Sequence, residues 1–303
     1  MILRYRGRTA VRPFKESMID KIVDFIKREE LNVYDIAVIS PEGAEEAYVT
    51  PCNPASENYS VTKLFISTIA GKFICEGRFA AGDSITDILA PYLKFDYDPV
   101  WNRVTVLDCL THRSGIDRGV LDIDCHDVSQ YPTDDYLKMI FDCPPVYEPG
   151  EFEYRTDVVH YLISRCISAV TGKPADTVIY EQLLKPMHFR QTWWARDPYG
   201  YTIGSSGSCM RASDVVKLGW LYLKNGVWEG RQLVPEEWIH TAEELKADLL
   251  PEGQTTFLRK GGMNGQIVMY SREHDTAVAW HSNSPDSRVN STATYIEQEL
   301  FKA

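Results

Sequence analysis

The order of strands and helices is the feature of this sequence that most constrains its fold. Residues 33–51 read as two short strands joined by a Pro-Glu-Gly turn, and residues 266–282 read as an antiparallel hairpin. Between them, from about residue 84 to residue 190, helical pieces alternate with loops. Strands near both ends with helices in the middle predict an α/β (α+β) protein. In it, one antiparallel sheet is built from both termini and flanked by helices, with a mainly helical region inserted.

Apolar residues at helical spacing predict where the main helices lie. Residues 61–76 are apolar nearly all round and stop at Gly77, which is typical of a buried helix with a glycine cap. For a later helix, Ser213 or Asp214 is placed to cap the start, and Gly226 to end it. The predicted helices span residues 17–29, 61–76, 212–226 and 291–302.

Composition excludes several classes of partner. The chain has 303 residues, with 43 acidic and 32 basic side chains and a net charge of −11. That balance argues against nucleic acid, because phosphate binding needs concentrated Lys and Arg. The sequence contains neither an 18-residue apolar stretch nor a leader-like segment. We therefore predict neither a membrane span nor export. Seven cysteines without a C-x-x-C pair favour reduced core thiols. We therefore expect a cytoplasmic protein.

A candidate nucleophile stands at Ser60. Ser60-Val-Thr-Lys63 fits the S-x-x-K pattern, in which a lysine follows a reactive serine by one helical turn. Residues three apart share a helix face, so Lys63 can reach the Ser60 hydroxyl. The positive end of the predicted helix favours a developing oxyanion, and its apolar surroundings desolvate the lysine. The alternative for this motif alone is a serine that caps a helix.

Other candidate sites are weaker. No G-x-S-x-G elbow is present, so an α/β-hydrolase nucleophile is missing. We interpret His112, in LTHRSG, as a structural residue at a helix–loop junction. An acidic loop from Asp117 to Asp127 fails the EF-hand pattern and is interpreted as solvated. We predict neither a metal nor an organic cofactor.

Several short motifs occur in a defined order along the sequence. Ser60-x-x-Lys63 precedes LTHRSGI at 110–116, an EPG at 148–150 and a late KGGMNGQ at 260–266. Stretches such as EGRFAAGDSITDIL and ISAVTGKP agree as well. Over residues 20–300 the chain resembles the serine β-lactamase and penicillin-binding-protein superfamily. The resemblance is to class C β-lactamases, DD-peptidases and family VIII-type esterases.

The resemblance implies roles for specific residues. Ser60 is the acyl-forming nucleophile, Lys63 its proton acceptor, and Tyr154 the tyrosine of the Y-x-N motif, a second general acid/base. Backbone N–H groups of Ser60 and Met263 form the oxyanion hole. The substrate-binding residues implied are Lys260, Gly261, Gly262, Met263 and Thr156. The fold implied has a sheet domain, residues 1–83 plus 191–303, and a helical domain, residues 84–190, with the active site at their interface.

Two departures from the family pattern affect these assignments. The Y-x-N motif reads Tyr154-Arg155-Thr156, so its asparagine is missing. Spacing from the preceding Pro-Gly is one residue short, and an ungapped alignment places Arg155 at the tyrosine and Asp157 at the asparagine. We prefer Tyr154 because F-x-Y is retained; a core tyrosine is the alternative. Gly261 replaces the threonine of K-T-G, which removes a hydroxyl that helps to bind the β-lactam carboxylate.

The resemblance implies a serine hydrolase that acts on a small ester or amide through a covalent acyl-enzyme. The two departures favour esterase-like activity. The alternatives are a non-catalytic β-lactamase-like binding protein and a genuine β-lactamase or DD-peptidase. The expected partner is a small-molecule substrate, and the sequence does not indicate an oligomeric state.

Overall fold

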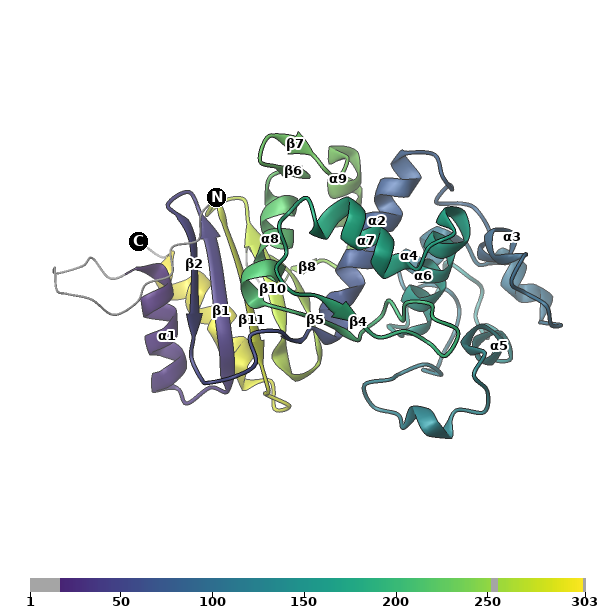
Figure 1. The fold of residues 1–303 in the computed structure, drawn as a ribbon, viewed down its shortest axis with the longest axis horizontal. Coiled ribbons are helices and arrows are strands. Elements are labelled where there is room, and N and C mark those ends of the chain that lie inside the picture. Colours follow the sequence, from purple (N-terminus) through teal and green to yellow (C-terminus); the bar gives the residue numbers. More distant parts are fainter. Residues whose placement is uncertain (1–16, 252–255, 302–303) are drawn as a thin grey trace. The chain divides into compact units, whose positions relative to one another are not determined.

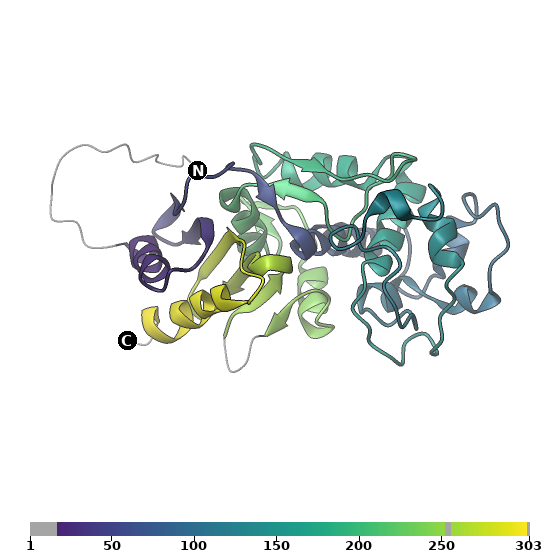
Figure 2. The same ribbon diagram turned by 90° about the horizontal axis from the view of Figure 1, so that it is seen from below.

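The computed structural model describes residues 17–251 and 256–301, which form two compact units. Figures 1 and 2 show the chain in two views. Among the described residues, the first unit contains residues 17–57, 210–224, 251 and 256–301. The second unit contains residues 58–209 and 225–250. Each unit is therefore assembled from segments that are distant in the sequence.

A six-stranded sheet in the order β2-β1-β11-β10-β9-β8 dominates the first unit. The pairs from β2 to β9 are antiparallel, and β1 joins β11 with Ala37 opposite Ala279. N-terminal strands thus pair directly with the C-terminal hairpin, which confirms the predicted sheet built from both termini. The strands are β1 (Val33–Ser40), β2 (Gly43–Tyr48), β8 (Leu250–Pro251), β9 (Leu258–Gly261), β10 (Ile267–Ser271) and β11 (Thr276–Ser282).

Helices cover both faces of this sheet. Side chains alternate between the faces along a strand, so Ile36 and Val38 point to one side and Ala37 to the other. The first set packs with α1 (Met18–Arg28) and α10 (Ser291–Tyr295), which lie side by side in Figure 2. The opposite face packs against α8 (Ala212–Leu223). At Gly219 of α8, an added Cβ would lie 3.1 Å from Val268 Cγ2, so helix and strand approach closely.

Helix ends differ in part from the prediction. Ser17 caps α1 in a capping box with Asp20, at the start of the helix predicted over residues 17–29. The predicted cap of α8 is wrong, because its N-cap is Arg211 and Asp214 lies buried inside the helix. Asp214 Oδ1 instead accepts from Lys217 Nζ at 2.6 Å, an ion pair one turn apart on the same helix. The C-terminal helix is α10 followed by a π-helical segment, Ile296–Leu300, and residue 302 lies outside the described residues.

The second unit is mainly helical. Its helices are α2 (Thr62–Cys75), α3 (Ile85–Leu89), α4 (Val106–Leu110), α5 (Tyr136–Phe141), α6 (Val158–Thr171), α7 (Ala175–Ile179) and α9 (Glu236–Glu244). Short strands accompany them: β4 (Trp193–Trp194) pairs with β5 (Ser208–Met210), and β6 (Val227–Trp228) pairs with β7 (Arg231–Gln232). The two-residue β3 (Ser56–Glu57) precedes α2 in the chain.

Helix α2 is the buried centre of this unit. Most of its residues are buried, and it packs against α6 and α9. Gly71 allows the closest approach, since an added Cβ would lie 1.7 Å from the Trp238 ring of α9. Gly77 follows the helix with φ +69°, the left-handed conformation predicted for its stop. None of the helices in the described part of the chain is long and apolar enough to cross a membrane.

Candidate active site

Ser60 lies in a tight turn that leads into α2. A 3₁₀ turn, Tyr59–Val61, precedes the helix, and Tyr59 adopts the left-handed conformation with φ 47°. Asn58 fixes this turn: its backbone N–H donates to Ser208 O at 2.8 Å and its side chain donates to Ser208 Oγ at 3.0 Å. No side-chain cap bond is present at the start of α2. Ser60 therefore does not act as a helix cap, and its half-buried hydroxyl is directed elsewhere.

The Ser60 hydroxyl contacts Lys63. Lys63 Nζ lies 2.6 Å from Ser60 Oγ, 2.6 Å from Asp157 Oδ1 and 3.0 Å from Ser205 O. An ammonium group has three N–H donors, and these three oxygens match them one to one. The Lys63 side chain is only 4% exposed, as the apolar sequence around it predicts. The geometry therefore joins the predicted nucleophile and the predicted base in one buried contact.

Asp157 is the third member of this cluster. It stands at the N-cap of α6 but makes no side-chain cap bond, because its carboxylate reaches Lys63 instead. The partial positive charge at the start of α6 favours a carboxylate at this place. In the sequence, Asp157 was only the residue that the ungapped alignment set at the asparagine position. An aspartate before a helix usually indicates a cap, which is why its contact with Lys63 was not predicted.

The structure does not bring Tyr154 or Arg155 into hydrogen-bonding contact with Ser60 or Lys63 within the described residues. The backbone N–H of Tyr154 donates to His112 O at 2.9 Å, and its side chain is partly exposed. Arg155 is exposed and pairs with Glu153 at 2.9 Å. The assignment of the second acid/base residue stays a prediction.

Two backbone groups predicted for the oxyanion hole have no acceptor. Neither the N–H of Ser60 nor the N–H of Met263 bonds to another described residue. Each lies in a tight turn of its own unit: Ser60 in the second, and Met263 beside Asn264, whose φ is 59°, in the first. Both N–H groups are therefore available to an external acceptor.

The remaining predicted substrate-binding residues have defined positions. Lys260, opposite Val268, is buried on β9. An added Cβ at the neighbouring Gly261 would meet only Gln266 O, at 3.8 Å, so the missing threonine is not excluded by lack of space. Gly262 donates its N–H to Gln266 O at 2.8 Å. Thr156 is buried, and its Oγ1 accepts from Val158 N at 3.4 Å at the start of α6.

Comparison with known protein families identifies the group to which this chain belongs. The family model named Beta-lactamase matches residues 53–301. The chain belongs to the beta-lactamase family. This confirms the membership that the motifs predicted, and as a member of the family the chain is a serine-type hydrolase. A search among curated proteins gives no match.

Solved structures share the fold. A Bacillus anthracis protein with the assigned name 6-aminohexanoate-dimer hydrolase has a TM-score of 0.73 at 14% identity, covering 90% of this chain and 79% of its own. A D-stereospecific amidohydrolase from Streptomyces sp. has 0.69 at 14%, covering 92% and 98%. EstCE1, a hydrolase with promiscuous acyltransferase activity, has 0.65 at 15%, covering 87% and 93%. At such identities these likenesses concern the fold alone.

A buried polar cluster lies one helical turn beyond Lys63. Asp248 accepts from Ser67 Oγ at 2.8 Å and contacts His160 Nε2 at 2.5 Å and His112 Nε2 at 3.4 Å. All four side chains are buried, and His112 follows α4 with φ 58°, at the helix–loop junction predicted from the sequence. No sequence pattern indicates Ser67, His160 or Asp248, because they come from distant segments.

Two histidines and a carboxylate also match the ligand set of a transition metal. The Nδ1 atoms of both His112 and His160 lack a partner among the described residues. A metal on Nε2 would leave each Nδ1–H buried without the acceptor that metal-bound histidines normally have. With Nε2–H donating to Asp248, each bare Nδ1 needs no acceptor. The cluster therefore fits a hydrogen-bonded network better than a metal centre.

This network predicts a loss of stability in acid. Burial lowers the pKa of His160 to about 4 in the folded protein, although Asp248 partly opposes the shift. In the unfolded chain a histidine takes up its proton near pH ~6.5. Stability is therefore complete above that pH, and up to about 3 kcal/mol is lost as the pH falls through the window to about 4. Urea unfolding of the wild type and His160→Gln at several pH values measures this.

The glutamine variant keeps an amide that can donate to Asp248 but cannot titrate. We expect it to be less stable than wild type at neutral pH and to lose less stability on acidification. Parallel pH dependences for the two proteins would show that His160 is not the group responsible.

Proposed function

We propose that this beta-lactamase family member hydrolyses carboxylic esters through a covalent acyl-enzyme on Ser60. The observation that carries the proposal is the contact of Lys63 Nζ with Ser60 Oγ and with Asp157 Oδ1, each at 2.6 Å. A serine hydroxyl is a weak nucleophile until a neighbouring base accepts its proton. In this protein that base is already in hydrogen-bonding contact, and a carboxylate lies directly behind it.

The proton path follows from these contacts. Lys63 first passes one proton to Asp157, which frees the lone pair of Nζ. As Ser60 Oγ bonds to the carbonyl carbon of the ester, the Ser60 proton then passes to Lys63 Nζ. The carbonyl π pair moves onto oxygen as the oxyanion, and Lys63 is again an ammonium. When the C–O bond to the alcohol breaks, Tyr154 gives its hydroxyl proton to the leaving oxygen and regains a proton from the Lys63–Asp157 pair.

Water then attacks the acyl-enzyme by the same steps. A proton of the water passes to the Lys63–Asp157 pair, and the water oxygen bonds to the acyl carbon. Ser60 is released after it regains a proton from that pair.

The oxyanion needs donors that are not already used. The free N–H of Ser60 supplies one, and the sequence assigns the second to the N–H of Met263. From the same resemblance, Lys260, Gly261 and Gly262 remain proposed substrate-binding residues, together with Thr156.

The preference for esters over β-lactams rests on missing side chains. Gly261 carries no hydroxyl for a β-lactam carboxylate, and Thr156 and Asp157 offer no side-chain amide. A short ester needs only nucleophile, base and oxyanion hole. Among the family's structural neighbours, EstCE1 is named as a hydrolase with acyltransferase activity, which agrees with an acyl-enzyme. The Streptomyces amidohydrolase makes amides the alternative substrate class.

Ser60 should be the residue that a fluorophosphonate probe labels. Intact-protein mass spectrometry is expected to show one adduct on wild type and none on Ser60→Ala.

Small p-nitrophenyl esters should be hydrolysed with a higher kcat/KM than a chromogenic cephalosporin.

Labelling that survives in the alanine variant, or that maps to another serine, would contradict the assignment of Ser60. Equal kcat/KM for the two substrates would contradict the ester preference. Turnover of neither substrate, without labelling, would favour a non-catalytic binding protein.

The role of Tyr154 can be tested through the leaving group. We propose that its hydroxyl gives the proton to the departing alcohol. Tyr154→Phe should then lower the hydrolysis of an alkyl ester by about 10²–10⁴-fold, the usual contribution of general acid catalysis. A p-nitrophenyl ester, whose leaving group needs no proton, should be much less affected. Steady-state kinetics with both substrates measure the difference, with thermal melts to establish folding.

Arg155→Lys is the matched control, because Arg155 is exposed and paired only with Glu153 within the described chain. We expect it to be nearly silent. A large loss for the lysine variant and none for Tyr154→Phe would support the ungapped alignment instead.

A further inference from the structure

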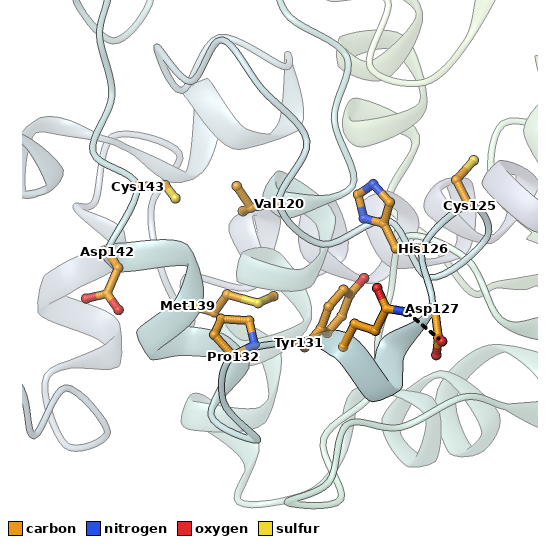
Figure 3. A pocket seen from close by; sticks show the side chains of 10 residues that line it. Val120, Cys125, His126, Asp127, Tyr131, Pro132, Met139, Asp142 and Cys143 are labelled. Atoms are coloured by element: carbon orange, nitrogen blue, oxygen red, sulfur yellow. Dashed lines mark hydrogen bonds between the residues drawn. The ribbon is translucent and has the colours of Figure 1, made fainter.

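A cavity of about 630 Å³ lies in the second unit, apart from the contacts described above. Its walls come from the 120–132 segment and from α5 with the residues that follow it (Figure 3). The volume falls in the range of small-molecule binding sites. Val120, Cys125, Tyr131, Pro132 and Met139 are among the residues that line it.

The cavity has an apolar wall beside polar groups that are uncharged or can be neutral, the side chains of His126 and Gln130 and the hydroxyl of Tyr131. In Figure 3, Met139, Pro132 and Tyr131 lie along one side and Val120 lies opposite. Burial, with the carboxylates of Asp122 and Asp157 adding to it, raises the pKa of Tyr131 to about 12, so its hydroxyl is uncharged.

The two carboxylates of the lining are already engaged. Asp127 accepts from Ser129 N at 3.0 Å and from Ser129 Oγ at 2.6 Å, while Asp142 pairs with Lys138 at 2.6 Å. Two acidic side chains at the wall disfavour an anionic ligand. The chemistry of the lining therefore fits an uncharged carbon group.

The segment that forms this wall also comes close to the residues around the proposed nucleophile. Cys125, at the wall, directly follows Asp124. Carboxylate oxygens of Asp122, Asp124 and Asp157 lie within 4.8 Å of one another. Asp157 in turn contacts Lys63, which contacts Ser60. The segment that walls the cavity thus also adjoins the residues that carry the proposed chemistry.

We propose that this cavity binds the apolar carbon group, aliphatic or aromatic, of the uncharged ester whose carbonyl reacts at Ser60. The inference rests on the proposed function. It adds that the preferred substrates carry more carbon than an acetyl group, because the cavity is larger than two carbons need. Each methylene that moves from water into the cavity should raise kcat/KM about fourfold until the space is filled.

Two ester series identify which part of the substrate occupies the cavity. In the first, p-nitrophenyl esters carry acyl chains that lengthen from acetyl to octanoyl; in the second, acetate esters carry alcohols that lengthen in the same steps. We expect kcat/KM to rise with length in one series. Met139→Trp, which places an indole in the cavity, should abolish that rise. Val146→Trp is the matched control, since Val146 is 53% exposed and lies outside the lining.

A flat length dependence in both series, or the same effect from both tryptophan variants, would overturn the proposal. Because Met139 is buried, its variant must first show a wild-type thermal melt.

A second measurement needs neither catalysis nor a change in the cavity. In Ser60→Ala protein, octanamide should slow iodoacetamide alkylation of the exposed Cys125 at least severalfold, as read by peptide mass spectrometry. Acetamide should not slow it, and Cys75, at the end of α2, should be unprotected. If Cys125 is protected but wild type is not labelled at Ser60, the cavity binds as proposed and the proposed function fails. If Cys125 is not protected, the cavity proposal fails whatever the activity.

Discussion

The contact between Lys63 and Asp157 is the interaction on which the proposed chemistry depends. An ammonium group that is only 4% exposed costs several kcal/mol to bury, so its position in the interior requires the carboxylate at 2.6 Å. Removing one member of such a pair typically costs about 3–5 kcal/mol, because the other charge is left unpaired. The pair also joins two helices, since Lys63 lies on α2 and Asp157 begins α6. The reactive hydroxyl of Ser60 is therefore held by the packing of α2 against α6.

The same two helices are joined a second time, deeper in the unit. Ser67, one turn beyond Lys63 on α2, and His160 on α6 both contact Asp248. A buried carboxylate is stable there because neighbouring groups donate to it. The two connections differ in chemistry. The Lys63–Asp157 contact is an ion pair beside a half-buried serine, whereas the contacts of Asp248 form a buried hydrogen-bonded network around a neutral imidazole. The proposed proton transfer uses the first connection, whereas the second maintains the contact between the helices.

Much of the fold could be predicted because its signals are local. Strand-like segments near both ends of the chain predict β1 and β11, which the structure pairs in one sheet, and Ser60 and Lys63 meet because residues three apart share a helix face. Asp157 could not be predicted in the same way. Its contact with Lys63 spans 94 positions in the sequence, and an aspartate before a helix has the ordinary meaning of a cap.

Errors in the prediction have the same origin. Asp214 has the residue type of a helix cap but lies inside α8, where Lys217 pairs with it. In both cases an ammonium group determines where the carboxylate points; the partner of Asp157 is distant in the sequence, whereas the partner of Asp214 lies one turn along the same helix. Asp248 is a further example, because nothing near it in the sequence indicates Ser67 or the two histidines.

The rate at which a fluorophosphonate labels Ser60 in Asp157→Asn protein tests the central claim most directly. Asparagine keeps the shape of the side chain but cannot accept the proton that Lys63 passes on. Lys63→Arg is the companion variant, since arginine keeps the ion pair and does not give up its proton. Intact-mass time courses should show labelling at least about 100-fold slower than wild type in both variants, with cooperative unfolding retained. Labelling of Asp157→Asn at or above the wild-type rate would contradict the account, because Asp157 would then only hold the proton on Lys63.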